Sequence, residues 1–176
     1  MSAQTRNVRL FLALWPDAGV RAAMAAFAAA WSLPHGCLKY RPEDWHVTLH
    51  YIGAFAIERI GALADAVEQP MEPFDLLLDE PRLWPRGLAV LEASRVPAPL
   101  QDLHRRLGAA LAESGVPVER RPYRPHVTLA RRAAGAPVPA GLAPVSWPAR
   151  SFALVVSTGS SDHRYEVLRE YRRQSR

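Results

Sequence analysis

The sequence contains one tetrapeptide twice, as His46-Val47-Thr48-Leu49 and as His126-Val127-Thr128-Leu129, eighty positions apart. The chain has six His and only four Thr among 176 residues, so random placement would give roughly 0.14 His-x-Thr pairs. Successive side chains of a strand alternate between its two faces, so the His and Thr of each copy share one face while the Val and Leu point into the core. The repeat therefore predicts a pseudo-symmetric body whose two halves each present an imidazole and a hydroxyl group across a groove.

Apolar runs and turn residues predict a mixture of strands and helices along the whole chain. The expected strands are residues 8–14, 45–52, 74–78, 88–91, 126–131, 151–157 and 164–171, and the expected helices are 18–31, 57–67 and 100–111. Residues 81–87 are expected to form a turn. Residues 133–149 contain four prolines and no periodicity, which predicts a long loop, either a lid or a passive excursion.

Length and cysteine content favour one domain in a reducing compartment. A chain of this size can bury roughly 70% of the surface that its unfolded form exposes, and nothing divides it, so we expect a single domain over residues 1–176 with one motif in each lobe. The lone Cys37 cannot form an intrachain disulfide. The Ala-rich run 22–31 is about half as long as a membrane span. We expect a cytoplasmic monomer without membrane association.

Positive charge is concentrated in the C-terminal third of the sequence. Residues 120–176 contain 11 basic and 3 acidic side chains, a net charge of +8, whereas residues 1–119 carry a net −3. Such an asymmetry indicates an anionic partner, with nucleic acid favoured over a membrane. The alternative is codon usage, because 21 of the 22 basic residues are Arg and a GC-rich genome would produce this excess without selection for a ligand.

The paired imidazoles and hydroxyls suit a phosphodiester between the two halves. Hydrolysis of a phosphodiester needs a base for the water proton, an acid for the leaving oxygen and donors for the developing charge. His46 and His126 can supply the acid and the base near pH 7, and Thr48 and Thr128 can donate to the non-bridging oxygens. This chemistry needs no cofactor and no metal, and the residues alone leave open which histidine is the acid.

Two further polar residues adjoin the motifs. Arg131 is a candidate phosphate ligand, although in a straight strand it would lie on the face of Val127, so its role requires the strand to end or twist there. His50 is expected to share the face of His46 and Thr48, but Ala130 occupies the matching place in the second copy, so we interpret His50 as structural. A zinc site from these two histidines is disfavoured because ~13 Å would separate them.

At these residues the sequence resembles the 2H phosphoesterase superfamily, in particular the bacterial and archaeal RNA 2',3'-cyclic phosphodiesterases, also known as 2'-5' RNA ligases. The resemblance covers nearly the whole chain. Beside the two motifs it includes the opening run 8–14, the extensions of the motifs over 46–53 and 121–131, and the terminal run 165–168.

The resemblance implies a bilobal α+β fold in which two antiparallel sheets form a central cleft with helices outside. It also implies hydrolysis of RNA 2',3'-cyclic phosphate ends to 2'-phosphates, as part of RNA processing, with RNA ends or small cyclic phosphate nucleotides as ligands. In such relatives the first motif histidine is the proton donor and the second the acceptor, which assigns these roles to His46 and His126. Many relatives have an aromatic residue in the strand that here is 88–91, so a base would have to stack on Trp84, Trp45 or Tyr51.

Three alternatives remain at the level of the sequence. The chain could be a binding module that holds RNA ends without turnover. The intact pairs of histidines and threonines disfavour this alternative, because a pure binder has no need for two titrating groups. Ligation to a 2'-5' linkage could be the relevant direction of the reaction. A metal-dependent phosphatase is the third alternative, and it predicts that a chelator abolishes activity.

Overall fold

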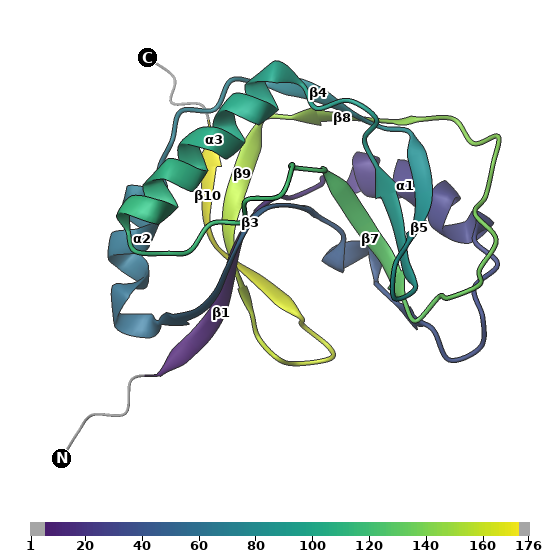
Figure 1. Cartoon of the computed structure of the whole chain (residues 1–176), viewed down its shortest axis with the longest axis horizontal. Coiled ribbons are helices and arrows are strands. Elements are labelled where there is room, and N and C mark those ends of the chain that lie inside the picture. The colour runs from purple at the N-terminus through teal and green to yellow at the C-terminus, as the bar shows by residue number, and fades with distance from the viewer. Residues whose placement is uncertain (1–5, 173–176) are drawn as a thin grey trace.

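The computed structural model describes residues 6–172 as an α+β protein built around one large antiparallel sheet (Figure 1). Its strands are β1 (Asn7–Leu14), β2 (Leu38–Lys39), β3 (Val47–Ala56), β4 (Phe74–Leu78), β5 (Glu80–Trp84), β6 (Leu88–Glu92), β7 (His126–Arg131), β8 (Val145–Ala149), β9 (Ser151–Ser157) and β10 (Tyr165–Arg172). Its helices are α1 (Ala18–Ala30), α2 (Ile60–Ala66) and α3 (Ala98–Glu113), with 3-10 turns η1 (Pro42–Asp44) and η2 (Ile57–Arg59).

The strand order divides the large sheet into two arms. The order is β10-β9-β1-β3-β7-β6-β5, with β2 paired to the end of β7, and every pairing is antiparallel. The arms join at β3 and β7 through the single pair Val47 and Val127. A second, two-stranded sheet is formed by β4 and β8. The expected α+β class with two antiparallel sheets is thus confirmed, and the two motifs lie where the arms meet.

The helices lie at the outer ends of the molecule and their apolar faces cover the sheets. Figure 1 shows α2 at one end of the long axis and α1 at the other. Helix α3 contacts β3 and α2, whereas α1 contacts β8. Asp17 caps α1, since its Oδ1 accepts a hydrogen bond of 2.9 Å from the Val20 amide. The helices therefore cover the back of each arm and leave the motif face open.

Two expectations about irregular segments are wrong. Residues 145–149 of the expected loop form β8, in which Val145, Trp147 and Ala149 are buried in alternation and pair with β4. Pro148 is compatible with a strand here because the sheet has only two strands, both of them edges. Residues 80–84 form β5, so the expected turn 81–87 shrinks to the end of a hairpin with β6.

Within residues 6–172, no helix has both the length and the apolar character that crossing a bilayer requires.

Candidate active site

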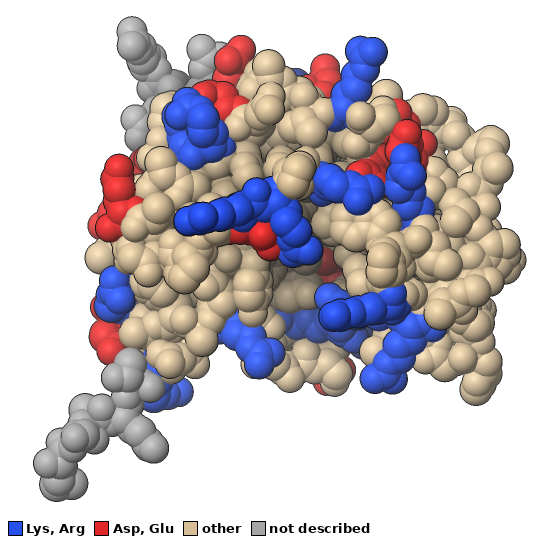
Figure 2. Space-filling view, in the orientation of Figure 1, with Lys and Arg blue, Asp and Glu red and all other residues tan. Residues whose placement is uncertain are grey.

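One pocket of about 370 Å³ brings together every residue that the sequence predicts for catalysis and phosphate binding. His46, Thr48, His126, Thr128 and Arg131 all line it. In the space-filling view it belongs to the hollow near the centre of the face, which Lys and Arg side chains border on several sides (Figure 2). The two tetrapeptides are therefore neighbours in space, as the predicted groove between the two halves of the molecule requires.

The pairing of Val47 with Val127 sets how the motifs meet. Both side chains are fully buried. In an antiparallel register centred on this pair, His46 lies across from Thr128, and Thr48 lies across from His126. The site thus has an approximate two-fold symmetry in which the histidine of each motif lies opposite the threonine of the other along the paired strands.

Each motif strand contains an irregularity just after its threonine. The register of β3 against β1 shifts between Thr48 and His50, and the register of β7 against β6 shifts between Thr128 and Ala130. In each case one Leu is the extra residue, and it and the residue after it are both buried. An extra residue of this kind is a β-bulge, which reverses the alternation of the side chains that follow it, up to the next register shift.

The bulge in β3 overturns the expectation that His50 shares the face of His46 and Thr48. His50 is buried, 4% exposed, and its Nε2 lies 2.8 Å from the carbonyl oxygen of His104 on α3. Tyr51 lies on the pocket wall instead. The interpretation of His50 as structural agrees with its burial.

The bulge in β7 explains why Arg131 reaches the pocket. Because the alternation is reversed, Arg131 lies on the same face of β7 as His126 and Thr128. Strand β7 ends at Arg131 because the next residue, Arg132, adopts a positive φ of 58°. The Nε of Arg131 donates a hydrogen bond of 2.5 Å to the hydroxyl of Tyr40, which follows β2. Strand β7 therefore changes its alternation and ends at Arg131, as a place for Arg131 in the pocket requires.

His46 is held in an aromatic cage. Its ring stacks on Trp15 at 5.3 Å with an interplanar angle of 7°, and it contacts Phe11 at 4.8 Å and Tyr165 edge-on at 5.1 Å. Its Nδ1 lies 2.7 Å from the carbonyl oxygen of Asp44. Removal from water lowers the pKa of His46 to about 4, and the nearby charge of His126 acts in the same direction.

His126 has a different environment, but its Nδ1 also bonds a backbone carbonyl two residues earlier. Its Nδ1 lies 2.7 Å from the carbonyl oxygen of Arg124, and its ring lies 4.3 Å from that of Trp84. The guanidinium of Arg124 covers Trp84 at 4.6 Å and forms a two-pronged ion pair with the buried Glu92, at 2.6 and 2.8 Å. Desolvation lowers the pKa of His126, while the charge of Glu92 raises it in part.

Both imidazoles consequently present the same atom to the pocket. A carbonyl oxygen can only accept a hydrogen bond, so the Nδ1 of His46 and of His126 must carry a proton. The tautomer is fixed, and Nε2 is the nitrogen left to exchange protons with a ligand. Each histidine can therefore act as a base when neutral and as an acid when doubly protonated.

Several pocket residues were not predicted from the sequence. They are Arg9, Phe11, Tyr40, Asp44, Leu88, Ser157 and Tyr165. Most come from strands far from the motifs in the chain, and only the pairing of β1 with β9 and β3 places them here. Tyr40 and Asp44 are the exceptions, since they lie shortly before the first motif in the chain.

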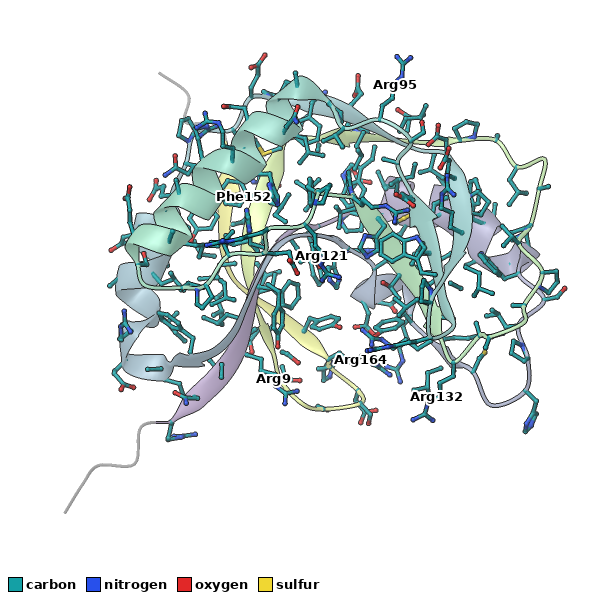
Figure 3. All side chains as sticks on the ribbon, in the orientation of Figure 1. Arg9, Arg95, Arg121, Arg132, Phe152 and Arg164 are labelled. Carbon is teal, nitrogen blue, oxygen red and sulfur yellow. The ribbon has the colours of Figure 1, made fainter. Side chains whose placement is uncertain are left out.

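A second pocket of about 620 Å³ adjoins the first. The two share Thr48, Tyr51 and His126, and the second extends to Trp84 and to Arg121 on the connection between α3 and β7. In Figure 3, Arg121 lies on that connection, whereas Arg9 and Arg164 lie toward the β9–β10 hairpin. The cleft therefore has two chambers that meet at the motif residues.

A stack of three rings lies behind Thr48. His104 packs between His50 and Tyr123, with ring centroids 4.0 Å apart on each side, and the Tyr123 hydroxyl donates a 3.1 Å hydrogen bond to the Thr48 carbonyl. Burial lowers the pKa of His104 to about 4 and also lowers that of His50, so neutral rings fill this space near pH 7. The stack fixes the backbone of the first motif from α3.

Across residues 6–172, no three or more His, Cys, Asp and Glu side chains form a group that could hold a metal ion.

Comparison with known proteins identifies relatives along most of the chain. Residues 6–160 match the family model described as the 2'-5' RNA ligase superfamily. The chain is 31% identical to the RNA 2',3'-cyclic phosphodiesterase of Escherichia coli over 132 residues, which cover 73% of this chain and 74% of that protein. It is 32% identical to the RNA 2',3'-cyclic phosphodiesterase of Thermus thermophilus over 165 residues, 85% of this chain and 82% of that one.

The fold is similar to that of solved structures. The crystal structure of E. coli LigT complexed with 3'-AMP superimposes with a TM-score of 0.81 and 25% identity, covering 97% of this chain and all of the other.

Proposed function

The chain belongs to the 2'-5' RNA ligase superfamily, and we propose that it hydrolyses 2',3'-cyclic phosphate ends of RNA, or small nucleotides with such an end, to 2'-phosphomonoesters. The observation that carries this proposal is the single pocket that holds two imidazoles with bare Nε2 atoms, two threonines and Arg131. These are the acid, base and charge-stabilising groups that opening a phosphodiester with water requires.

The reaction is a displacement at phosphorus. The Nε2 of neutral His126 takes a proton from a water molecule as its oxygen bonds to phosphorus, and the protonated Nε2 of His46 gives its proton to O3' as the P–O3' bond breaks. The product is the 2'-phosphate, and exchange with solvent then restores the two protonation states.

The remaining pocket residues stabilise charge on the phosphate. Thr48 and Thr128 have hydroxyls on the pocket wall for the non-bridging oxygens. Arg131 adds a permanent positive charge that Tyr40 orients through its hydrogen bond. Because the bound phosphodiester is an anion, it raises the pKa of His46 from about 4 and favours the protonated form that the acid role needs.

The proposal is tested by following hydrolysis of adenosine 2',3'-cyclic phosphate in excess chelator and identifying the position of the product phosphate. We expect the 2'-phosphate at an undiminished rate, since every proposed catalytic group is a side chain. His46→Ala and His126→Ala should each lower kcat by roughly 10² to 10⁴.

The matched control is His35→Ala, because His35 is exposed and lies outside both pockets. It should keep wild-type turnover. Wild-type turnover in either motif variant, or its loss on chelation, would contradict the mechanism. Tight binding of the substrate without turnover would favour the binding module, and formation of 2'-5' linkages from suitable ends would favour ligation.

A further inference from the structure

Glu92 is a buried acidic residue beside the second motif. It is the last residue of β6, its side chain is buried, and it lies opposite His126 in the register between β6 and β7. It lies outside the lining of both pockets, so it does not contact a ligand bound there. A carboxylate is costly to bury unless charged partners and hydrogen bonds compensate, so the partners of Glu92 indicate its role.

Three side chains from β5 and from the segment before β7 converge on this carboxylate. Arg124 donates from Nε to Oε1 at 2.6 Å and from Nη2 to Oε2 at 2.8 Å. The indole Nε1 of Trp84 donates to Oε2 at 3.3 Å, and the Nε of Arg82 lies 3.3 Å from the same oxygen. Both oxygens of Glu92 therefore have N–H partners, two of them cationic, which compensates for the burial of the charge.

Two of these partners also contact His126. The carbonyl oxygen of Arg124 accepts the hydrogen bond from the Nδ1 of His126 at 2.7 Å. The ring of Trp84 lies 4.3 Å from the imidazole on one side, and the guanidinium of Arg124 lies 4.6 Å from the Trp84 ring. Glu92 thereby anchors the two residues that fix the tautomer and the ring orientation of His126.

The charge of Glu92 also distinguishes the second motif histidine from the first. It raises the pKa of His126, against desolvation and the charge of Arg124, whereas burial lowers the pKa of His46 to about 4. A base is more effective when its pKa is higher, and an acid when its pKa is lower, which matches the roles of the two histidines. Other charged or imidazole groups that line the pockets with His126 are Arg9, Asp44, His46, Glu119, Arg121 and Arg131.

We propose that Glu92 is a positioning residue for the base His126, which holds the imidazole through Arg124 and Trp84 and stabilises the imidazolium that forms during the reaction. The inference rests on the proposed function and adds to it a residue that does not touch the substrate. As the water oxygen bonds to phosphorus, its proton passes to the Nε2 of His126, while the Nδ1 proton stays on the Arg124 carbonyl. His126 becomes a cation at this step, and the carboxylate of Glu92 favours that form.

NMR titration of the His126 imidazole tests the proposal without substrate. Glu92→Gln keeps the shape of the side chain but removes its charge and leaves Arg124 unopposed, so it should lower the pKa of His126. Arg124→Gln removes the opposing cation and should raise that pKa. If Glu92 served only packing, its replacement would let water reach the ring, and the pKa of His126 would instead rise toward its ordinary value of 6.5.

Kinetics on adenosine 2',3'-cyclic phosphate measure the consequence for turnover. Glu92→Gln should lower kcat by roughly 10-fold to 100-fold, less than the loss of the imidazole itself, because the base is weakened and less well held. The KM should change little, since Glu92 lies outside the lining of both pockets. The alkaline limb of the kcat/KM profile should move to lower pH with the pKa of His126. Glu92→Asp, which keeps the charge, should return the limb toward its wild-type position.

Asp102→Asn is the matched control. Asp102 on α3 also accepts hydrogen bonds from two arginines, Arg105 at 2.6 Å and Arg106 at 2.8 Å, and it lines neither the motif pocket nor the adjoining 620 Å³ pocket. Its replacement should change neither kcat nor the pKa of His126. An unchanged or raised pKa of His126 in Glu92→Gln, or an equal fall in Asp102→Asn, would overturn the inference.

Two further comparisons keep the test decisive. If Glu92→Gln does not fold, Arg124→Gln is compared with the double variant Glu92→Gln/Arg124→Gln, in which no unpaired arginine remains at position 124. The pKa of His126 should be lower in the double variant, and equal values would overturn the inference. If the wild type does not hydrolyse the cyclic phosphate, the proposed function fails, while the titration of His126 still tests Glu92.

Discussion

His46 and His126 acquire the same tautomer by the same means, although they come from opposite arms of the sheet. Each Nδ1 donates to the carbonyl oxygen of the residue two positions earlier, Asp44 or Arg124. What differs is the surroundings of the rings, because three aromatic rings pack against His46, whereas His126 lies near the carboxylate of Glu92. The two pKa values are lowered to different extents for this reason, and both remain below the ordinary value of 6.5.

These lowered pKa values predict the pH profile of kcat/KM, which reports ionisations of the free enzyme. Turnover needs one neutral and one protonated histidine. The profile should be a bell whose acid limb lies near the pKa of His46, about 4, and whose alkaline limb follows the pKa of His126, below 6.5. At saturating substrate the kcat profile should shift to higher pH, because the bound anion favours both imidazolium forms. Steady-state rates between pH 3.5 and 9 measure both profiles, and an alkaline limb of kcat/KM above pH 7 would contradict this assignment.

At the scale of the elements, the bulges of β3 and β7 decide which residues belong to the site. Local alternation was sufficient to predict that His46 and Thr48 share a face, because both precede the bulge. Alternation gives the wrong face for His50, and it places Arg131 in the site only if the strand twists. The reason is that a bulge depends on how two strands pair and cannot be read from one strand alone. Nothing within 46–53 identifies β1 as its partner, which is why the aromatic cage of His46 could not be predicted either. The signal that was available and missed is the apolar alternation of Val145, Trp147 and Ala149 in β8.

A second register shift in β3 makes a prediction about Gly53. Gly53 has a φ of +82° where the pairing with β1 shifts again between Tyr51 and Gly53. A side chain at this φ is strained, so Gly53→Ala should lower the free energy of unfolding by about 1–2 kcal/mol. Urea denaturation followed by circular dichroism measures the change.

Gly61→Ala provides the matched control for that substitution. Gly61 lies in α2 without positive φ, and a Cβ there would meet nothing within 4 Å. Because Ala has a higher helix propensity than Gly, this variant should gain up to about 1 kcal/mol. Equal effects of the two substitutions would mean that the backbone at Gly53 imposes no glycine requirement.

At the scale of the whole molecule, the positive charge of the C-terminal third is partly neutralised by the rest of the chain. Among the described arginines from position 120 onward, five pair with carboxylates, namely Arg121, Arg124, Arg164, Arg169 and Arg172. All but one of the carboxylate partners precede residue 120, so the net +8 of the segment overstates the charge available to a ligand. The cations that line the motif pocket without a carboxylate partner among residues 6–172 are Arg9 and Arg131.

This distribution predicts a modest salt dependence of RNA binding. Arg131 serves the reacting phosphate in any substrate, so an oligonucleotide gains over a mononucleotide only the contacts of Arg9 and of cations outside the pocket. Each phosphate contact on a single strand contributes about −0.7 to the slope of log affinity against log salt, so the oligonucleotide slope should be steeper by about 0.7 to 1.4. Titrations of the His126→Ala variant with both ligands, each carrying the same cyclic end, measure binding without turnover.

Adding Arg9→Ala should reduce the oligonucleotide slope by about 0.7, whereas Arg169→Ala, whose guanidinium already pairs with Asp65 at 2.6 Å, should leave it unchanged. Equal slopes for the two ligands would mean that the chain recognises only the terminal nucleotide, and that its excess of arginine reflects codon usage.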